Sequence, residues 1–88
     1  MKTLKVIYNN QTTFIVDVAE KFKDFFHLEL FNYDSKQKKK TKLLMEDFGT
    51  MNFPLIIIQD ENLETVSAIW SESSPNWEDK IDEILKNN

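Results

Sequence analysis

The sequence predicts a single α/β domain over residues 1–88, with a mixed four-stranded sheet flanked by helices. Three observations predict it. One short, unbroken apolar run is typical of a strand buried on both faces, three other segments are rich in β-forming residues, and further segments space their apolar residues as a helix does. Eighty-eight residues suffice for one domain and leave no room for a second. The expected order is β-α-β-α-β-β-α, with elements over 3–8, 14–26, 28–33, 41–48, 55–58, 65–71 and 75–86.

The first helix is the element for which two interpretations compete. After a polar break at 9–11, apolar residues recur on one helical face as far as Phe26, and either Thr12 or Thr13 can cap the N-terminus. A β-hairpin is the alternative, since several residues of 12–18 are β-branched. The hairpin leaves the helical spacing unexplained, so a helix is expected. Its apolar positions are 14, 15, 18, 19, 22, 25 and 26.

A lysine-rich segment follows the second strand and reads as a polar loop. The short helix after it is expected to turn Leu43, Leu44 and Phe48 inward, and Gly49 suits the position just after its end. The lysines of the loop are Lys36, Lys38, Lys39, Lys40 and Lys42.

The C-terminal third contains a turn, a strand and a helix. The turn is indicated by polar residues at 60–62. Ser74 suits the N-cap of the last helix and Pro75 its first position. The last strand is expected to place three apolar residues on one face: Val66, Ala68 and Trp70. The last helix is expected to line one face with Trp77, Ile81, Ile84 and Leu85.

The composition restricts the chemistry. With 41% apolar residues the chain can form a core, but it has no cysteine and one histidine, so neither a disulfide nor a Cys/His zinc site can support it. No metal or cofactor is expected. The N-terminus does not resemble a signal peptide, and no apolar stretch is long enough to span a bilayer. A cytoplasmic location without membrane contact is therefore expected.

The charge of the chain is divided unevenly between its two halves. Residues 1–42 hold nine lysines and five acids, a net charge of +4, whereas residues 43–88 hold two lysines and ten acids, a net charge of −8. The chain has no arginine, which lowers the expectation of sequence-specific nucleic-acid binding, since lysine lacks the bidentate contacts of a guanidinium group. The lysine- and asparagine-rich composition is consistent with a low-GC bacterial or phage genome.

Two segments resemble a known fold. Asn52 to Ile58 resembles the loop and strand of the thioredoxin fold, of the glutaredoxin kind, in which a cis-proline opens the third strand and faces the active site. Residues 6–8 and 19–22 resemble its first strand and first helix. The resemblance covers nearly the whole chain and implies a cis bond between Phe53 and Pro54.

The same resemblance places the two redox cysteines of that family at Thr13 and Val16, within the segment Thr13–Phe14–Ile15–Val16. A threonine hydroxyl is not ionised near neutral pH and valine carries no reactive group. The helix N-terminus that would lower the pKa of a thiol has no thiol to act on. Composition therefore excludes thiol–disulfide exchange by this chain, and we expect it not to be an enzyme.

The sequence favours a non-catalytic protein-binding module, an adaptor or an inhibitor, with an unknown protein partner and oligomeric state. A remnant glutathione or peptide binder is one alternative, because the backbone before Pro54 could pair with an extended peptide and a lysine of 36–42 could meet a carboxylate. It is disfavoured because Thr65 and Val66 occupy the positions of the residues that grip glutathione in related transferases. Nucleic-acid contact through the lysine segment is the other alternative, and a solvated loop is the simpler explanation of those lysines.

Overall fold

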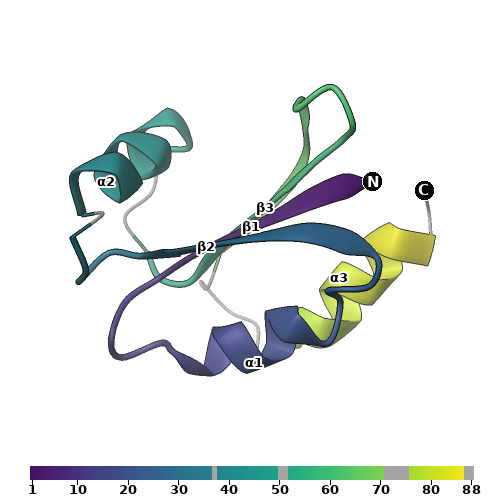
Figure 1. The fold of residues 1–88 in the computed structure, drawn as a ribbon, viewed down its shortest axis with the longest axis horizontal. Coiled ribbons are helices and arrows are strands. Elements are labelled where there is room, and N and C mark those ends of the chain that lie inside the picture. The colour runs from purple at the N-terminus through teal and green to yellow at the C-terminus, as the bar shows by residue number, and fades with distance from the viewer. Residues whose placement is uncertain (37, 50–51, 71–75, 87–88) are drawn as a thin grey trace.

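The computed structural model describes residues 1–36, 38–49, 52–70 and 76–86 (Figure 1). Its strands are β1 (Lys2–Tyr8), β2 (Phe26–Asn32), β3 (Leu55–Gln59) and β4 (Thr65–Trp70). Its helices are α1 (Phe14–Glu20), α2 (Lys38–Asp47) and α3 (Trp77–Lys86). The predicted order β-α-β-α-β-β-α is therefore confirmed.

The four strands form one mixed sheet in the order β2-β1-β3-β4. β1 runs parallel to β2 and antiparallel to β3, and β4 pairs antiparallel with β3. Val6 in β1 is thus paired with Leu30 on one side and with Ile56 on the other. Because β1 and β3 are the central strands, β3 can be apolar along the whole run 55–58, and all four side chains are buried.

Helices cover both faces of the sheet. α1 and α3 lie side by side under one face, and α2 lies over one end of the other face (Figure 1). Successive side chains of β1 point to opposite faces of the sheet, so they contribute to two cores. Val6 belongs to the core between the sheet and α1 and α3, and Ile7 belongs to the core between the sheet and α2. The larger core holds Leu4, Val6, Ile15, Ala19, Phe22, Phe26, Ile56, Ile58, Trp77 and Ile81. The smaller core holds Ile7, Phe31, Met45, Leu55 and Ile57.

The first helix is shorter than its apolar spacing predicts. α1 ends at Glu20, and the backbone then makes successive turns, in which the amides of Phe25 and Phe26 both donate to the carbonyl oxygen of Phe22. Phe26 begins β2, and the Phe25 side chain is 56% exposed. The apolar spacing wrongly extends the helix to Phe26 because the Phe26 ring packs in the same core from a strand. Its centroid lies 6.4 Å from that of Phe22.

Neither threonine caps α1 as expected. Thr13 holds the cap position but makes no side-chain cap hydrogen bond. The Thr12 hydroxyl instead donates to Asn9 Oδ1 at 2.8 Å and accepts from the Asn9 amide at 3.0 Å. The threonine therefore closes the turn after β1 rather than the helix.

The second helix begins earlier than predicted, so most of the lysine segment is helical and not a loop. Lys38, Lys39, Lys40 and Lys42 lie on α2. Its buried face is set by Thr41 and Met45, one turn apart, with Leu44 and Phe48 partly buried beside them. Leu43 points away from that face and is 58% exposed, which corrects the expectation that it turns inward. Gly49 has φ 67° just after the helix, as expected of a residue in the left-handed region.

The turn between β3 and β4 and the last helix agree with the sequence where the structure describes them. Asp60 Oδ1 accepts hydrogen bonds from the amides of Asn62 and Glu64, which closes the turn. On β4, Val66 is exposed, while the Trp70 side chain lies outside the described residues, as do Ser74 and Pro75. α3 buries two of its four predicted residues, Trp77 and Ile81, and packs Ile84 and Leu85 against the same core.

Within the described residues, no helix has both the length and the apolar character needed to cross a bilayer.

Candidate functional site

The positions at which the resemblance places the redox cysteines, Thr13 and Val16, lie at the start of α1. Thr13 and Phe14 are exposed, Val16 is half-buried and Ile15 is fully buried in the larger core. No side chain of this segment is a thiol, and none ionises near neutral pH. What the segment exposes instead is an aromatic ring, because the Phe14 side chain is 49% exposed.

The Phe53–Pro54 segment lies at the same end of the sheet as the start of α1. The Phe53–Pro54 peptide bond is cis, and Pro54 is buried. Leu55, the first residue of β3, pairs with Ile7 near the end of β1, and α1 follows β1 after a short turn. The Phe53 ring packs against Tyr33, with ring centroids 5.1 Å apart. The fold thus brings to one end of the sheet two segments that are about forty residues apart in the sequence.

Two of the lysines lie against the protein's own aromatic rings. Lys38 Nζ is 4.9 Å from the centroid of Tyr33, and Lys40 Nζ is 5.3 Å from that of Phe31. Such contacts are attractive because the ring face carries partial negative charge. The remaining lysines of the segment, Lys36, Lys39 and Lys42, are exposed.

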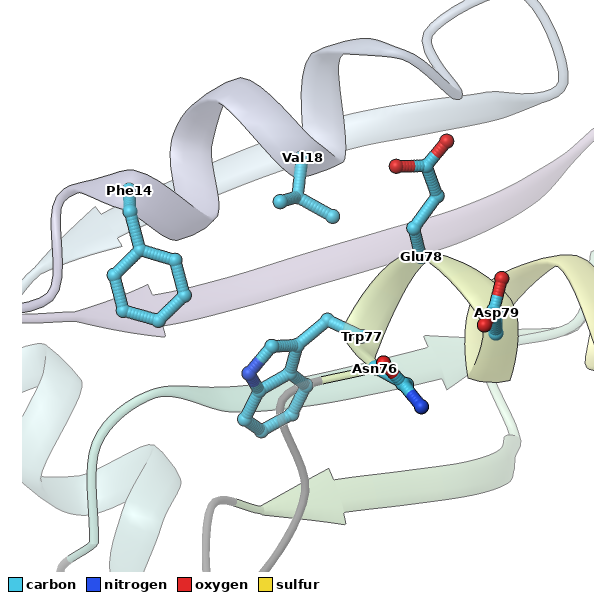
Figure 2. A pocket seen from close by; sticks show the side chains of 6 residues that line it. All are labelled: Phe14, Val18, Asn76, Trp77, Glu78 and Asp79. Carbon is cyan, nitrogen blue, oxygen red and sulfur yellow. The ribbon is translucent and has the colours of Figure 1, made fainter.

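A groove between α1 and α3 is the site that the sequence does not predict. It encloses about 270 Å³ and is lined by Phe14, Val18, Asn76, Trp77, Glu78 and Asp79. Figure 2 shows Phe14 and Val18 of α1 facing Trp77 of α3, with the two carboxylates on the α3 side. The groove is apolar along the helices and acidic at one rim. The apolar spacing of α1 assigns Phe14 to the core, so only the packing of α1 against α3 shows that it lines a groove.

One ion pair joins the two helices at this groove. Lys21 Nζ lies 2.9 Å from Glu78 Oε2, across from the end of α1 to the first turn of α3. Asp79 adds a second carboxylate to the same rim. At the other end of α3, a hydrogen bond from Lys86 to Asp82, with the charge of that carboxylate, raises the pKa of Lys86 above its ordinary 10.5. The groove rim thus carries two carboxylates of α3, one of them paired with the ammonium group of Lys21.

The only histidine, His27, is exposed on β2, with Nε2 3.5 Å from Glu29 Oε2. In the part of the chain that the structure describes, histidine, aspartate and glutamate side chains form no group of three that could hold a metal ion.

Comparison with known proteins agrees with this architecture. No protein-family model matches the sequence, and no curated protein matches it. Among solved structures, the chain is similar to the exposed lipoprotein thioredoxin of Streptococcus pneumoniae strain TIGR4, with a TM-score of 0.65 over 99% of this chain and 84% of that one. At 11% identity, this likeness bears on the fold and not on activity. The cytoplasmic location stays a prediction. The chain has a thioredoxin-like fold that lacks the redox cysteines.

Proposed function

We propose that this chain is a non-catalytic protein-binding module, an adaptor or an inhibitor, that docks its partner in the groove between α1 and α3. The observation that carries the proposal is Phe14, a half-exposed phenyl ring beside an apolar groove at the helix end where this fold otherwise holds a thiol. A phenyl ring in that position can contact a partner but cannot catalyse thiol exchange, and aromatic side chains in partly desolvated pockets are common anchors of protein interfaces.

The groove is near the lower size limit of small-molecule sites. Its volume of about 270 Å³ lies below the roughly 300–1,000 Å³ of most small-molecule sites. It suits one or two side chains of a partner. Because Phe14, Val18 and Trp77 supply the apolar surface and Glu78 and Asp79 supply negative charge, the partner segment is expected to present an apolar side chain flanked by basic ones.

The test is capture of a partner from a lysate of the native host with the tagged chain. We expect a stoichiometric protein that is retained by the wild type and lost with Phe14→Lys, because a cation on the groove wall repels a basic segment. Phe25→Lys is the matched control: Phe25 is also a half-exposed phenylalanine, it does not line the groove, and the charge change is the same. Retention by both variants would show that the partner binds elsewhere, and capture of no protein by the wild type would contradict the proposal.

The same capture distinguishes the nucleic-acid alternative. Retained nucleic acid that is released at high salt would favour the lysines of 36–42, since phosphate contacts weaken steeply with salt. Two contacts in the structure give this alternative less support. Lys38 and Lys40 lie over the protein's own rings, and the same helix carries Glu46 and Asp47.

A further inference from the structure

The two faces of the molecule differ in charge. α2, on one face of the sheet, carries four lysines against two acids, and Lys36 precedes it. α1 and α3, on the other face, together carry six acids against two lysines, and Lys21 follows α1. The charge asymmetry of the sequence thus becomes an asymmetry in space, with a basic helix over one face of the sheet and acidic helices under the other (Figure 1).

The basic face has an apolar centre. Leu43 is one of the most exposed large apolar side chains of the described chain and lies on the outer side of α2. Lys39 precedes it by four residues and lies one turn away along the same side of the helix, whereas Lys40 Nζ lies over the Phe31 ring. Leu43 therefore projects as an apolar side chain with the ammonium group of Lys39 one turn away. This is the pattern that the groove between α1 and α3 is expected to bind.

The groove has the complementary arrangement. Phe14, Val18 and Trp77 form its apolar part, and Glu78 and Asp79 place carboxylates at its rim. Of these carboxylates, Glu78 already has a contact with Lys21 across the helices. An incoming lysine would share the rim with that pair, and Leu43 would contact the exposed ring of Phe14.

We propose that copies of this chain associate head to tail, with Leu43 and the lysines of α2 in one copy docked in the groove between α1 and α3 of the next. This deepens the proposed function, on which it rests, by naming the partner as a second copy. The basic face of one copy attracts the acidic face of another. Contact between two basic or two acidic faces is disfavoured, since like charges brought together in an interface repel.

The position of the two surfaces sets the form of the assembly. Because α2 and the groove lie on opposite faces of the sheet (Figure 1), one pair of copies cannot make the contact in both directions at once. Each docked pair leaves one free α2 and one free groove. The contact is heterologous, and such contacts extend into open chains unless their rotation closes a ring.

The contact is small, so the association is weak and depends on salt. One leucine and a few exposed charge pairs suggest a Kd on the order of 0.1–1 mM. The pairs are at the protein surface, where a Debye length of about 10 Å at 0.1 M salt already screens most of their attraction.

Sedimentation of the full chain at rising concentration tests the proposal. At low salt we expect the weight-average mass of the wild type to rise with concentration past that of two copies, and to fall toward one copy as salt increases. Leu43→Glu places an acid opposite an acidic rim, and Phe14→Lys places a cation opposite the lysines. Each variant alone is expected to remain a monomer.

Mixing the two variants is the decisive measurement. The Leu43→Glu variant keeps an intact groove and the Phe14→Lys variant keeps an intact α2, so an equimolar mixture should regain the wild-type contact and sediment with a higher weight-average mass than either variant alone. Complementation also shows that both variants are folded. The matched controls are Leu63→Glu and Phe25→Lys, exposed apolar positions outside both surfaces, which should associate as the wild type does.

Three outcomes would overturn the proposal. The first is a wild type that stays monomeric up to about 1 mM at low salt. The second is a wild type that stops at a dimer, which indicates a two-fold interface instead. The third is a variant mixture that stays monomeric while the wild type associates. If the wild type is monomeric but a host protein is captured in a Phe14-dependent manner, self-association fails and the proposed function stands.

Discussion

At the scale of single residues, Phe14 and Ile15 show how adjacent apolar side chains take different parts. Ile15 is fully buried in the larger core, whereas Phe14 keeps about half of its surface exposed and lines the groove. The difference follows from helix geometry, which turns neighbouring side chains about 100° apart. Ile15 stabilises the fold, and the ring of Phe14 stays partly exposed beside the groove.

Ile81 provides the residue-scale test of the packing between α3 and the sheet. It is fully buried in the larger core. Ile81→Ala removes buried methyl and methylene groups and leaves a cavity, so we expect the free energy of unfolding to fall by about 2–5 kcal/mol. Urea denaturation measures this fall. The total free energy of unfolding of a small domain is only about 5–15 kcal/mol, so a loss of this size would be easily measured.

The control for that change is Leu43→Ala, another loss of an aliphatic side chain from a helix. Leu43 is exposed, so the free energy of unfolding should change by no more than about 0.5 kcal/mol. Equal losses at the two positions would contradict the burial described for Ile81 and for Leu43.

At the scale of elements, the charged residues at the ends of α3 match its helix dipole, whereas those at the ends of α2 do not. α3 has Glu78 and Asp79 in its first turn and Lys86 in its last, which matches the partial positive charge at a helix N-terminus and the partial negative charge at its C-terminus. α2 has no acid in its first turn and no base in its last. Its first residues are lysines, so its N-terminal end is electrostatically unfavourable. That arrangement suits a helix whose lysines serve contact with a partner.

Lys39→Glu tests this interpretation of α2. An acid in the first turn interacts favourably with the dipole, so we expect the free energy of unfolding to rise by about 0.3–1 kcal/mol at low salt. Thermal and urea unfolding, at a protein concentration too low for association, measure the rise. Lys42→Glu makes the same charge change beyond the first turn and should stabilise less.

The same Lys39 variant links stability to association. If the lysines of α2 bind the acidic groove of another copy, Lys39→Glu stabilises the monomer and weakens self-association together. An unchanged association constant in sedimentation would show that Lys39 takes no part in the contact.

At the scale of the whole molecule, the absence of a thiol and the charge around the groove decide which small ligands fit. Glutathione carries two carboxylates, and the groove beside the start of α1 is rimmed by Glu78 and Asp79. Lys21 pairs with Glu78 and offsets part of that repulsion, while the chain supplies neither a cysteine nor an arginine. We therefore expect glutathione not to bind beside the acidic rim.

Nuclear magnetic resonance titration tests this at Thr13 and Phe53, the two segments that the fold brings to one end of the sheet. We expect their amide resonances to stay unchanged on adding glutathione, apart from what potassium chloride of equal ionic strength produces. Saturable shifts confined to these residues would instead support a remnant glutathione or peptide site.

Much of the architecture could be predicted from the sequence because it depends on local patterns. The run 55–58 predicts a central strand, and the spacing of the last helix predicts which of its residues face the core, since the inward face of a strand or helix is encoded in the period of its apolar residues. The absence of cysteine excludes thiol chemistry in any fold. Gly49 could be assigned because few other residues adopt a positive φ without strain.

The boundaries and the groove were decided only by the tertiary structure. Phe26 continues the helical spacing of α1 but belongs to a strand, because a core accepts a ring from either element. Phe14 follows the apolar spacing of α1 and Leu43 that of the predicted short helix, yet Phe14 stays half-exposed and Leu43 points away from the buried face of α2. A sequence pattern states which side chains favour burial. Whether another element is present to cover them depends on how the elements pack, and the exposed ring, the groove and the separation of charge by face all follow from that packing.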